Sequence, residues 1–121
     1  MLDIEKFIQQ LPNGYQTQLL PGGKNIPGSV RNKIILARGL VSKPQFFTLE
    51  DIFSNMEVDD KSQMIDLLTS KQNNWTLVGV SDDLEFAKKC DRIFIMRKGE
   101  IIEEGTFEQI KNSAHFKNVF R

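Results

Sequence analysis

The sequence is poor in the residues that form disulfides, metal sites and nucleophile-based active sites. Its 121 residues include one cysteine, Cys90, and one histidine, His115. A single cysteine excludes an internal disulfide framework and fits a reducing compartment. No second cysteine or histidine stands at metal-ligand spacing from Cys90, so we expect it to be a small packing residue. We expect His115 on the surface or in helix packing, and we find no Ser–His–Asp arrangement.

An excess of charge of either sign and long hydrophobic runs are also lacking. Lys plus Arg and Asp plus Glu both number 16, which gives a formal net charge of zero. Charge therefore gives no reason to predict a nucleic acid or an anionic membrane as a partner. No apolar run approaches the length of a membrane span, and the first residues lack the apolar core of a signal peptide. A membrane role would have to come from a partner or from other sequence.

What the chain contains is a regular succession of helix and strand patterns. We expect helices near residues 3–11, 29–43, 58–71 and 82–90, and again after Thr106 and before the C-terminus; we expect strands at 46–49, 76–80, 92–96 and 100–103. Asp3 is expected to cap the first helix, and Gly99 to turn the last hairpin. Strands that alternate with helices and end in a hairpin predict an α/β layered fold in a single domain, residues 1–121.

The stretch Ile26–Asp51 is the centre of this pattern. Ser29 is a plausible N-cap, Pro44 ends the helix, and one apolar helical face is predicted from Val30, Ile34, Ala37 and Val41. The apolar runs 46–49 and 76–80 are of the kind found in strands buried on both faces.

Two carboxylates, Glu50 and Asp51, follow the first strand at the end where open α/β sheets place ligands. A hydrophobic strand followed by two acids is a Walker-B-like pattern, in which one acid holds Mg²⁺ and the next orients water. Acids after a strand also occur as helix caps or in solvated turns, so this alternative stays open. The segment 23–29 has the glycine spacing of a phosphate loop but no lysine before Ser29, and we reject it as one.

The order and spacing of these pieces resemble the nucleotide-binding domain of ATP-binding-cassette (ABC) transporters of the exporter type. The resemblance rests on LPNGYQT at 11–17, LARGL at 36–40 followed by Lys43-Pro44, and AKKCDRIFIMRKGEIIEEG at 87–105. It covers nearly the whole chain and the C-terminal half of the family's domain. It implies a partial P-loop-NTPase-like layered fold, with parallel strands, a C-terminal hairpin and flanking helices, that lacks the central P-loop strand.

The positions that carry the family's chemistry differ in this chain. Ile26–Val30 stands where the family has Leu-Ser-Gly-Gly-Gln, so the resemblance assigns nucleotide binding to Pro27, Gly28 and Ser29 in degenerate form. Pro27 has neither a hydroxyl nor an N–H for a phosphate. The family's Asp-Glu pair aligns with Glu50, implied to bind Mg²⁺, and Asp51, implied to be catalytic. Asp82 takes the place of the switch histidine, where a carboxylate would repel phosphate, and Glu57 takes that of the D-loop aspartate.

The resemblance implies a fragment of a transporter's ATP-binding domain, on the cytoplasmic side of a membrane. ATP and Mg²⁺ are the cofactors of the parent family, and none is expected for this chain alone. The implied partners are a second nucleotide-binding domain and a transmembrane domain, with no nucleic acid. Two alternatives remain: a competent ATPase half without its P-loop, and a stand-alone pseudo-ATPase that serves interaction or regulation.

The absent central strand has a structural consequence. Strands 76–80 and 92–96 would flank it, and their backbone edges would be left open. They either pair directly within one molecule or are covered by a second copy of the chain. We expect the second, because closing the gap would disturb the packing of the flanking helices.

Overall fold

The computed structural model describes residues 4–120. Its helices are α1 (Glu5–Gln10), α2 (Gly28–Val41), α3 (Val58–Thr69), α4 (Leu84–Lys89), α5 (Phe107–Ile110) and α6 (Ala114–Val119); its strands are β1 (Phe46–Glu50), β2 (Thr76–Val80), β3 (Ile93–Arg97) and β4 (Glu100–Gly105). Each predicted element forms, with shifted ends. Two short 3₁₀ turns, Gly14–Gln16 and Pro21–Gly23, lie in the segment predicted as loop. The predicted cap Asp3 lies outside the described residues.

The strands form two separate two-stranded sheets. β1 and β2 are parallel, from Phe46 opposite Thr76 to Glu50 opposite Val80. β3 and β4 are an antiparallel hairpin, turned by Gly99 at a positive φ of 81° as the sequence predicts. β2 and β3 do not pair. Of the two outcomes expected for these strands, direct pairing within one molecule therefore does not occur.

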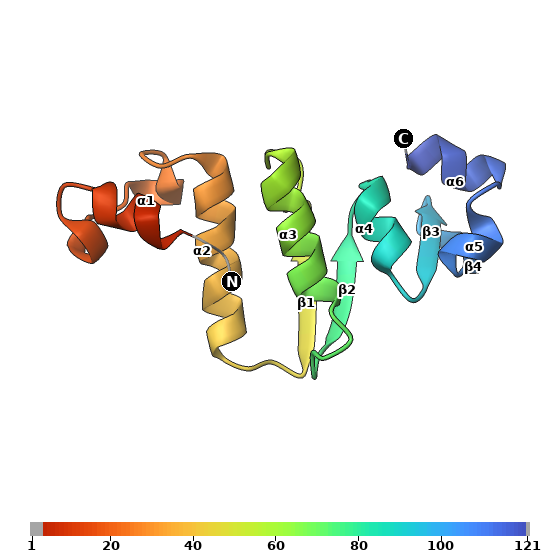
Figure 1. Ribbon diagram of the computed structural model, residues 1–121. Coiled ribbons are helices and arrows are strands. Elements are labelled where there is room, and N and C mark those ends of the chain that lie inside the picture. The colour runs from red at the N-terminus through yellow and green to blue at the C-terminus, as the bar shows by residue number, and fades with distance from the viewer. Residues whose placement is uncertain (1–3, 121) are drawn as a thin grey trace.

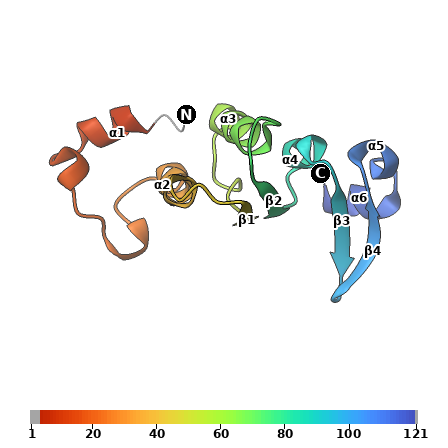
Figure 2. The same ribbon diagram turned by 90° about the horizontal axis from the view of Figure 1, so that it is seen from below.

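Helices α3 and α4 lie on the same side of the β1–β2 sheet (Figures 1 and 2). No element within residues 4–120 covers the other face. Phe46 is therefore 60% exposed and Val80 is 65% exposed. The prediction that both strands are buried on two faces is wrong, because only one helical layer is present in the described part of the chain.

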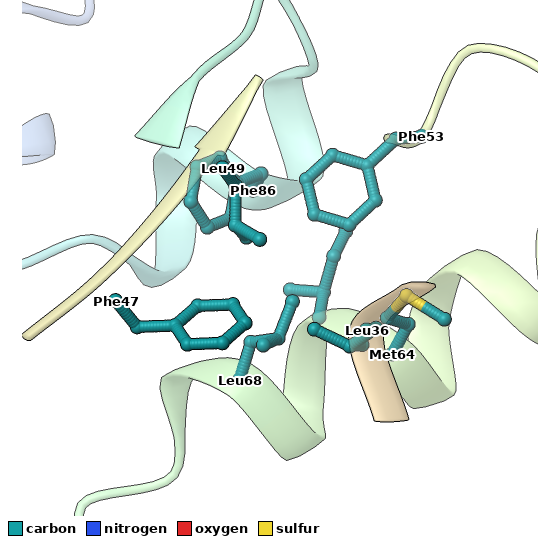
Figure 3. Close-up of a cluster of buried hydrophobic side chains, with 8 residues drawn as sticks. Leu36, Phe47, Leu49, Phe53, Met64, Leu68 and Phe86 are labelled. Atoms are coloured by element: carbon teal, nitrogen blue, oxygen red, sulfur yellow. The ribbon is translucent and has the colours of Figure 1, made fainter. Parts of the chain in front are cut away.

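The core consists of two clusters of buried side chains. The first lies between α2, α3, α4 and the β1–β2 sheet and contains Leu36, Phe47, Leu49, Phe53, Met64, Ile65, Leu68 and Phe86 (Figure 3). The second lies under the hairpin and contains Ala87, Ile93, Ile95, Ile110 and Phe116. Phe86 and Ala87 are neighbours on α4, yet they belong to different clusters. Cys90 packs against both clusters, as a small apolar residue would.

The buried side of α2 is not the one that the sequence predicts. Lys33 and Leu36 are its buried residues, whereas Val41 is 81% exposed. Leu36 enters the first cluster, and Gly39 lies against the Phe47 ring, where a Cβ would come within 2.8 Å. Contacts with distant parts of the chain therefore override the apolar periodicity.

The N-terminal segment packs least closely. None of the α1 residues is buried, although their apolar side chains have helical spacing. Figure 2 shows α1 apart from the sheets and beyond α2. No helix within residues 4–120 has the length and apolar character needed to cross a membrane.

Candidate functional site

The carboxyl ends of the two parallel strands meet at one edge of their sheet. Glu50, the last residue of β1, is opposite Val80, the last residue of β2, and the N–H of Asp51 donates to the Val80 carbonyl at 3.1 Å. Asp82 follows two residues after Val80. The parallel register therefore brings Glu50, Asp51 and Asp82 to the same edge, and all three residues are exposed.

Asp51 has an unusual backbone conformation. Its φ is 47°, in the left-handed region that few residues other than glycine adopt. Aspartate is one of the residues that tolerate this region, because its short polar side chain can bond locally. The chain thus reverses sharply at the strand end.

The signature-like segment starts helix α2. The N-cap position is Pro27, with φ −56° and ψ 145°, and no side chain caps the helix. The prediction that Ser29 is the N-cap is wrong, since Ser29 lies inside the first turn. The first helical bond runs from the Arg31 N–H to the Pro27 carbonyl at 3.0 Å. Proline suits this place sterically but contributes no N–H donor there.

The start of α2 lies beside the connector between β1 and α3. A Cβ built on Gly28 would lie 4.0 Å from the Cβ of Asn55, and the Asn32 side chain donates to the Ile52 carbonyl at 3.1 Å. Glu57 is the N-cap residue of α3 and is exposed, and its side chain makes no capping bond. The fold therefore brings Gly28 close to the connector that joins Asp51 to Glu57.

A polar cavity of about 610 Å³ lies next to Asp82. Its lining residues come from the starts of α3 and α4 and the end of α6: Lys61, Asp82, Asp83, Leu84, Glu85, Asn118 and Val119. Glu50, Asp51 and Gly28 are not among them. The sequence-predicted residues are thus divided between the sheet edge and the α2 start, and only Asp82 borders this cavity.

The described residues do not complete a metal site. Within residues 4–120, no group of three or more His, Cys, Asp or Glu side chains could hold a metal ion. Glu50 and Asp51 offer the oxygen donors that Mg²⁺ prefers, but Mg²⁺ sites of this kind also use substrate phosphates and waters. The two carboxylates would supply only part of such a site, and we derive no step through the metal.

The sequence reasoning missed two ion pairs that flank these segments. Lys33 of α2 is 7% exposed and lies 2.8 Å from an Asp60 carboxylate oxygen. Lys61 lies 2.7 Å from an oxygen of Asp83. In each pair the partners are more than twenty residues apart in the chain, so no local pattern could have identified them.

Asp83 also caps α4, since its side chain accepts from the Phe86 N–H at 3.0 Å. Burial by itself raises the pKa of Asp83. The hydrogen bond from Lys61, the backbone N–H groups of Phe86 and Glu85 and the Lys61 charge outweigh it, so the pKa lies below its ordinary value of 3.8.

Cys90 and His115, to which the sequence analysis assigns no catalytic or metal-binding role, lie where it expects them. Burial, helped by the charge of Asp91, raises the pKa of the Cys90 thiol to about 11, which fits a packing role. His115 is exposed on α6. Trp75 packs near Phe47, with ring centroids 6.2 Å apart, and donates its indole N–H to the Leu68 carbonyl at 3.2 Å.

No family model matches the chain, but curated relatives match most of it. It is 32% identical over 110 residues to the ABC multidrug transporter mdr4 of Aspergillus fumigatus, a match that covers 91% of this chain and 8% of that protein. It is 28% identical over 116 residues to the multidrug resistance-like ATP-binding protein MdlB of Buchnera aphidicola, with 95% of this chain and 20% of that protein covered. The chain thus spans about a fifth of these relatives' length or less.

The fold is also similar to a solved structure. A bacterial Atm1-family ABC exporter with ATP bound superposes with a TM-score of 0.86 over 98% of this chain and 21% of that chain, at 19% sequence identity. The fold of this chain is thus similar to that of a part of the exporter chain.

Proposed function

Because the chain is homologous over nearly its whole length to part of the ABC transporters of the exporter type, we propose that it is the C-terminal portion of such a transporter's ATP-binding domain. The observation that carries this proposal is the near-complete coverage of the chain by relatives named as an ABC multidrug transporter and a multidrug resistance-like ATP-binding protein. In the parent protein, the domain would couple ATP to transport across a membrane. It would lie on the cytoplasmic side, with a transmembrane domain and a second nucleotide-binding domain as partners.

We further propose that the ATP sites of the parent are degenerate. Pro27 offers no N–H where the family presents a phosphate-binding helix start, and Ser29 adds a side chain to the first turn of α2. Asp51 stands in place of a longer glutamate, and a misplacement of about 1 Å can lower a rate by on the order of 10²-fold. Asp82 would place a carboxylate near a phosphate, and Glu57 replaces a shorter aspartate.

Two measurements test this function. Calorimetric titration of the chain with Mg-ATP is expected to show no binding at micromolar nucleotide, because the chain has no phosphate loop. The full-length parent is expected to show weak or absent ATPase activity. Turnover comparable to ordinary exporters, abolished by Asp51→Asn, would instead identify a competent ATPase half. The ATPase assay needs the upstream sequence, and a G-x-x-x-x-G-K-[ST] loop there would support the fragment assignment.

The arrangement of strands supports a missing central strand. β2 and β3 run on either side of α4 in separate sheets, and each carries exposed apolar residues, Val78 and Val80 on β2 and Phe94 and Met96 on β3. Parallel sheets are ordinarily covered on both faces. In the parent, the P-loop strand and the helix after it would fill this region. In the isolated chain, we propose that a second copy covers part of it.

A stand-alone pseudo-ATPase module is the second candidate. The observation that favours it is that Met64, Ile65 and Leu68 are each no more than 2% exposed without any other chain. A packed core of this kind is what a separate module needs. An uninterrupted reading frame for this chain alone, with no transmembrane segments, would favour the module over the fragment.

A further inference from the structure

The first turn of α3 is joined to two other helices by adjacent residues. Asp60 accepts from Lys33 of α2 at 2.8 Å, and Lys61 donates to Asp83, at the start of α4, at 2.7 Å. The side chain of Lys33 is 9% exposed and that of Asp83 is 14% exposed. Both pairs are therefore more shielded from water than ordinary surface ion pairs, which contribute little.

This same turn of α3 lacks a cap of its own. Its N-cap residue, Glu57, makes no side-chain hydrogen bond to the helix. The first four N–H groups of a helix have no intrahelical partner, so an uncapped turn frays easily. The lateral pairs through Asp60 and Lys61 hold the turn in place of a cap.

Each lateral pair also fixes a segment beyond α3. Lys33 follows closely after Gly28 and Ser29, and Asn32 next to it donates to the Ile52 carbonyl, so the pair sets where the start of α2 lies. Asp83 is adjacent to Asp82 and caps α4. The position of Asp82 thus depends on the bond that Lys61 makes.

We infer that the uncapped first turn of α3 is a two-state element that couples the start of α2 to the start of α4. When one ion pair is lost, the turn frays, and the other pair loses its fixed partner. Local opening of this kind has a low free energy where a turn has few other bonds. Asp60 and Lys61 are then positioning residues for the start of α2 and the start of α4. The coupling requires no nucleotide, so it stands apart from the proposed function.

The coupling is measured by amide hydrogen exchange on the full chain. Asp83→Asn removes the charge but leaves an acceptor for the α4 cap, since asparagine caps as well as aspartate. We expect faster exchange of the Arg31–Lys33 amides in α2, by about threefold or more, which exceeds the scatter of independent sites. Glu85→Gln breaks an exposed pair with Lys88 on the same helix and is the matched control. It is expected to leave α2 unchanged.

Reciprocity makes the test stringent. Lys33→Met must speed exchange in α4 by an equivalent factor, because coupling free energy is the same in both directions. In the double variant that combines Asp83→Asn with Lys33→Met, the effects of the two substitutions on amide exchange must be non-additive. A capping residue introduced by Glu57→Ser is expected to abolish both remote effects, since it holds the turn independently.

If Asp83→Asn unfolds the chain, Lys61→Met replaces it. Exchange changes confined to the mutated helix, additive effects, or remote effects that persist with Glu57→Ser would each overturn the inference.

Discussion

Gly79 of β2 lies directly against the ring of Phe86 of α4, so that a Cβ built on the glycine would come within 2.5 Å of a ring carbon. Phe86 belongs to the first core cluster, packed against Phe53 with ring centroids 5.1 Å apart. A glycine inside a strand often marks such a close approach. This contact sets how closely α4 lies on the sheet.

Gly79→Ala is expected to lower the free energy of unfolding by about 1–3 kcal/mol, the usual range for overpacking a core. Gly28→Ala is the control, because its Cβ would meet nothing closer than 3.6 Å. Its effect is expected within about 0.5 kcal/mol. Urea unfolding followed by circular dichroism measures both. Equal effects of the two substitutions would contradict the close approach at Gly79.

The Asp83 carboxylate predicts a pH-dependent part of the stability. Its pKa is lowered in the folded state, so the folded protein binds the proton less readily than the unfolded chain does. The stabilisation is therefore present above pH 3.8 and is lost as the pH falls through the lower, folded-state pKa. We expect Asp83→Asn to be destabilising at pH 7 and to approach the stability of the native protein as the pH falls through the lowered, folded-state pKa of Asp83. A constant difference between the two proteins across this range would contradict the prediction.

Cys90 is expected to react slowly with iodoacetamide. Its pKa of about 11 leaves little thiolate at pH 8, and the thiol donates to the Phe86 carbonyl at 3.2 Å. Mass spectrometry is expected to show slow alkylation of the folded chain and fast alkylation in guanidinium chloride. Equal rates in the two conditions would mean that the thiol is accessible in the folded chain.

Self-association of the isolated chain is expected through the uncovered side of β2 and β3. Sedimentation velocity between 5 and 200 µM, roughly the range in which weak dimers form, is expected to show a concentration-dependent shift. Replacing Val80 and Phe94 by serine removes apolar surface that is 65% and 51% exposed, and we expect it to weaken the association. Val58→Ser, at an apolar site that is 75% exposed on α3, is the control. A monomer at all concentrations would refute self-association.

Local features of the fold were predictable, and features that depend on distant residues were not. The helix predicted after Thr106 forms, and Thr106 and Gln109 cap it with both reciprocal bonds of a capping box. The buried side of α2 could not be predicted, because Lys33 is buried by pairing with Asp60, far along the chain. Burial of β1 and β2 depends on how many helical layers cover them, which a strand's own residues do not specify.

In the candidate site, too, some features follow from the local sequence and others do not. The strand pattern correctly placed Glu50 and Asp51 at the carboxyl end of β1, and the parallel register brings Asp82 to the same edge. The Ser29 cap was wrong because the N-cap lies two residues earlier, at Pro27, where proline's fixed φ suits the N-cap position. Roles in nucleotide binding rest on the resemblance and stay predictions.

The core divides between Phe86, which packs with the parallel sheet, and Ala87, which packs under the hairpin. This division has a consequence for how the chain folds. The hairpin pairs residues that are close in sequence, such as Arg97 and Glu100, whereas the parallel sheet pairs Phe46 with Thr76. Contacts between near residues form faster, since little loop-closure entropy opposes them. During synthesis, however, β1 and β2 leave the ribosome before the hairpin does. The slower unit is thus exposed first, and its apolar strands are open to chaperones and to misassembly while the faster unit is still being made.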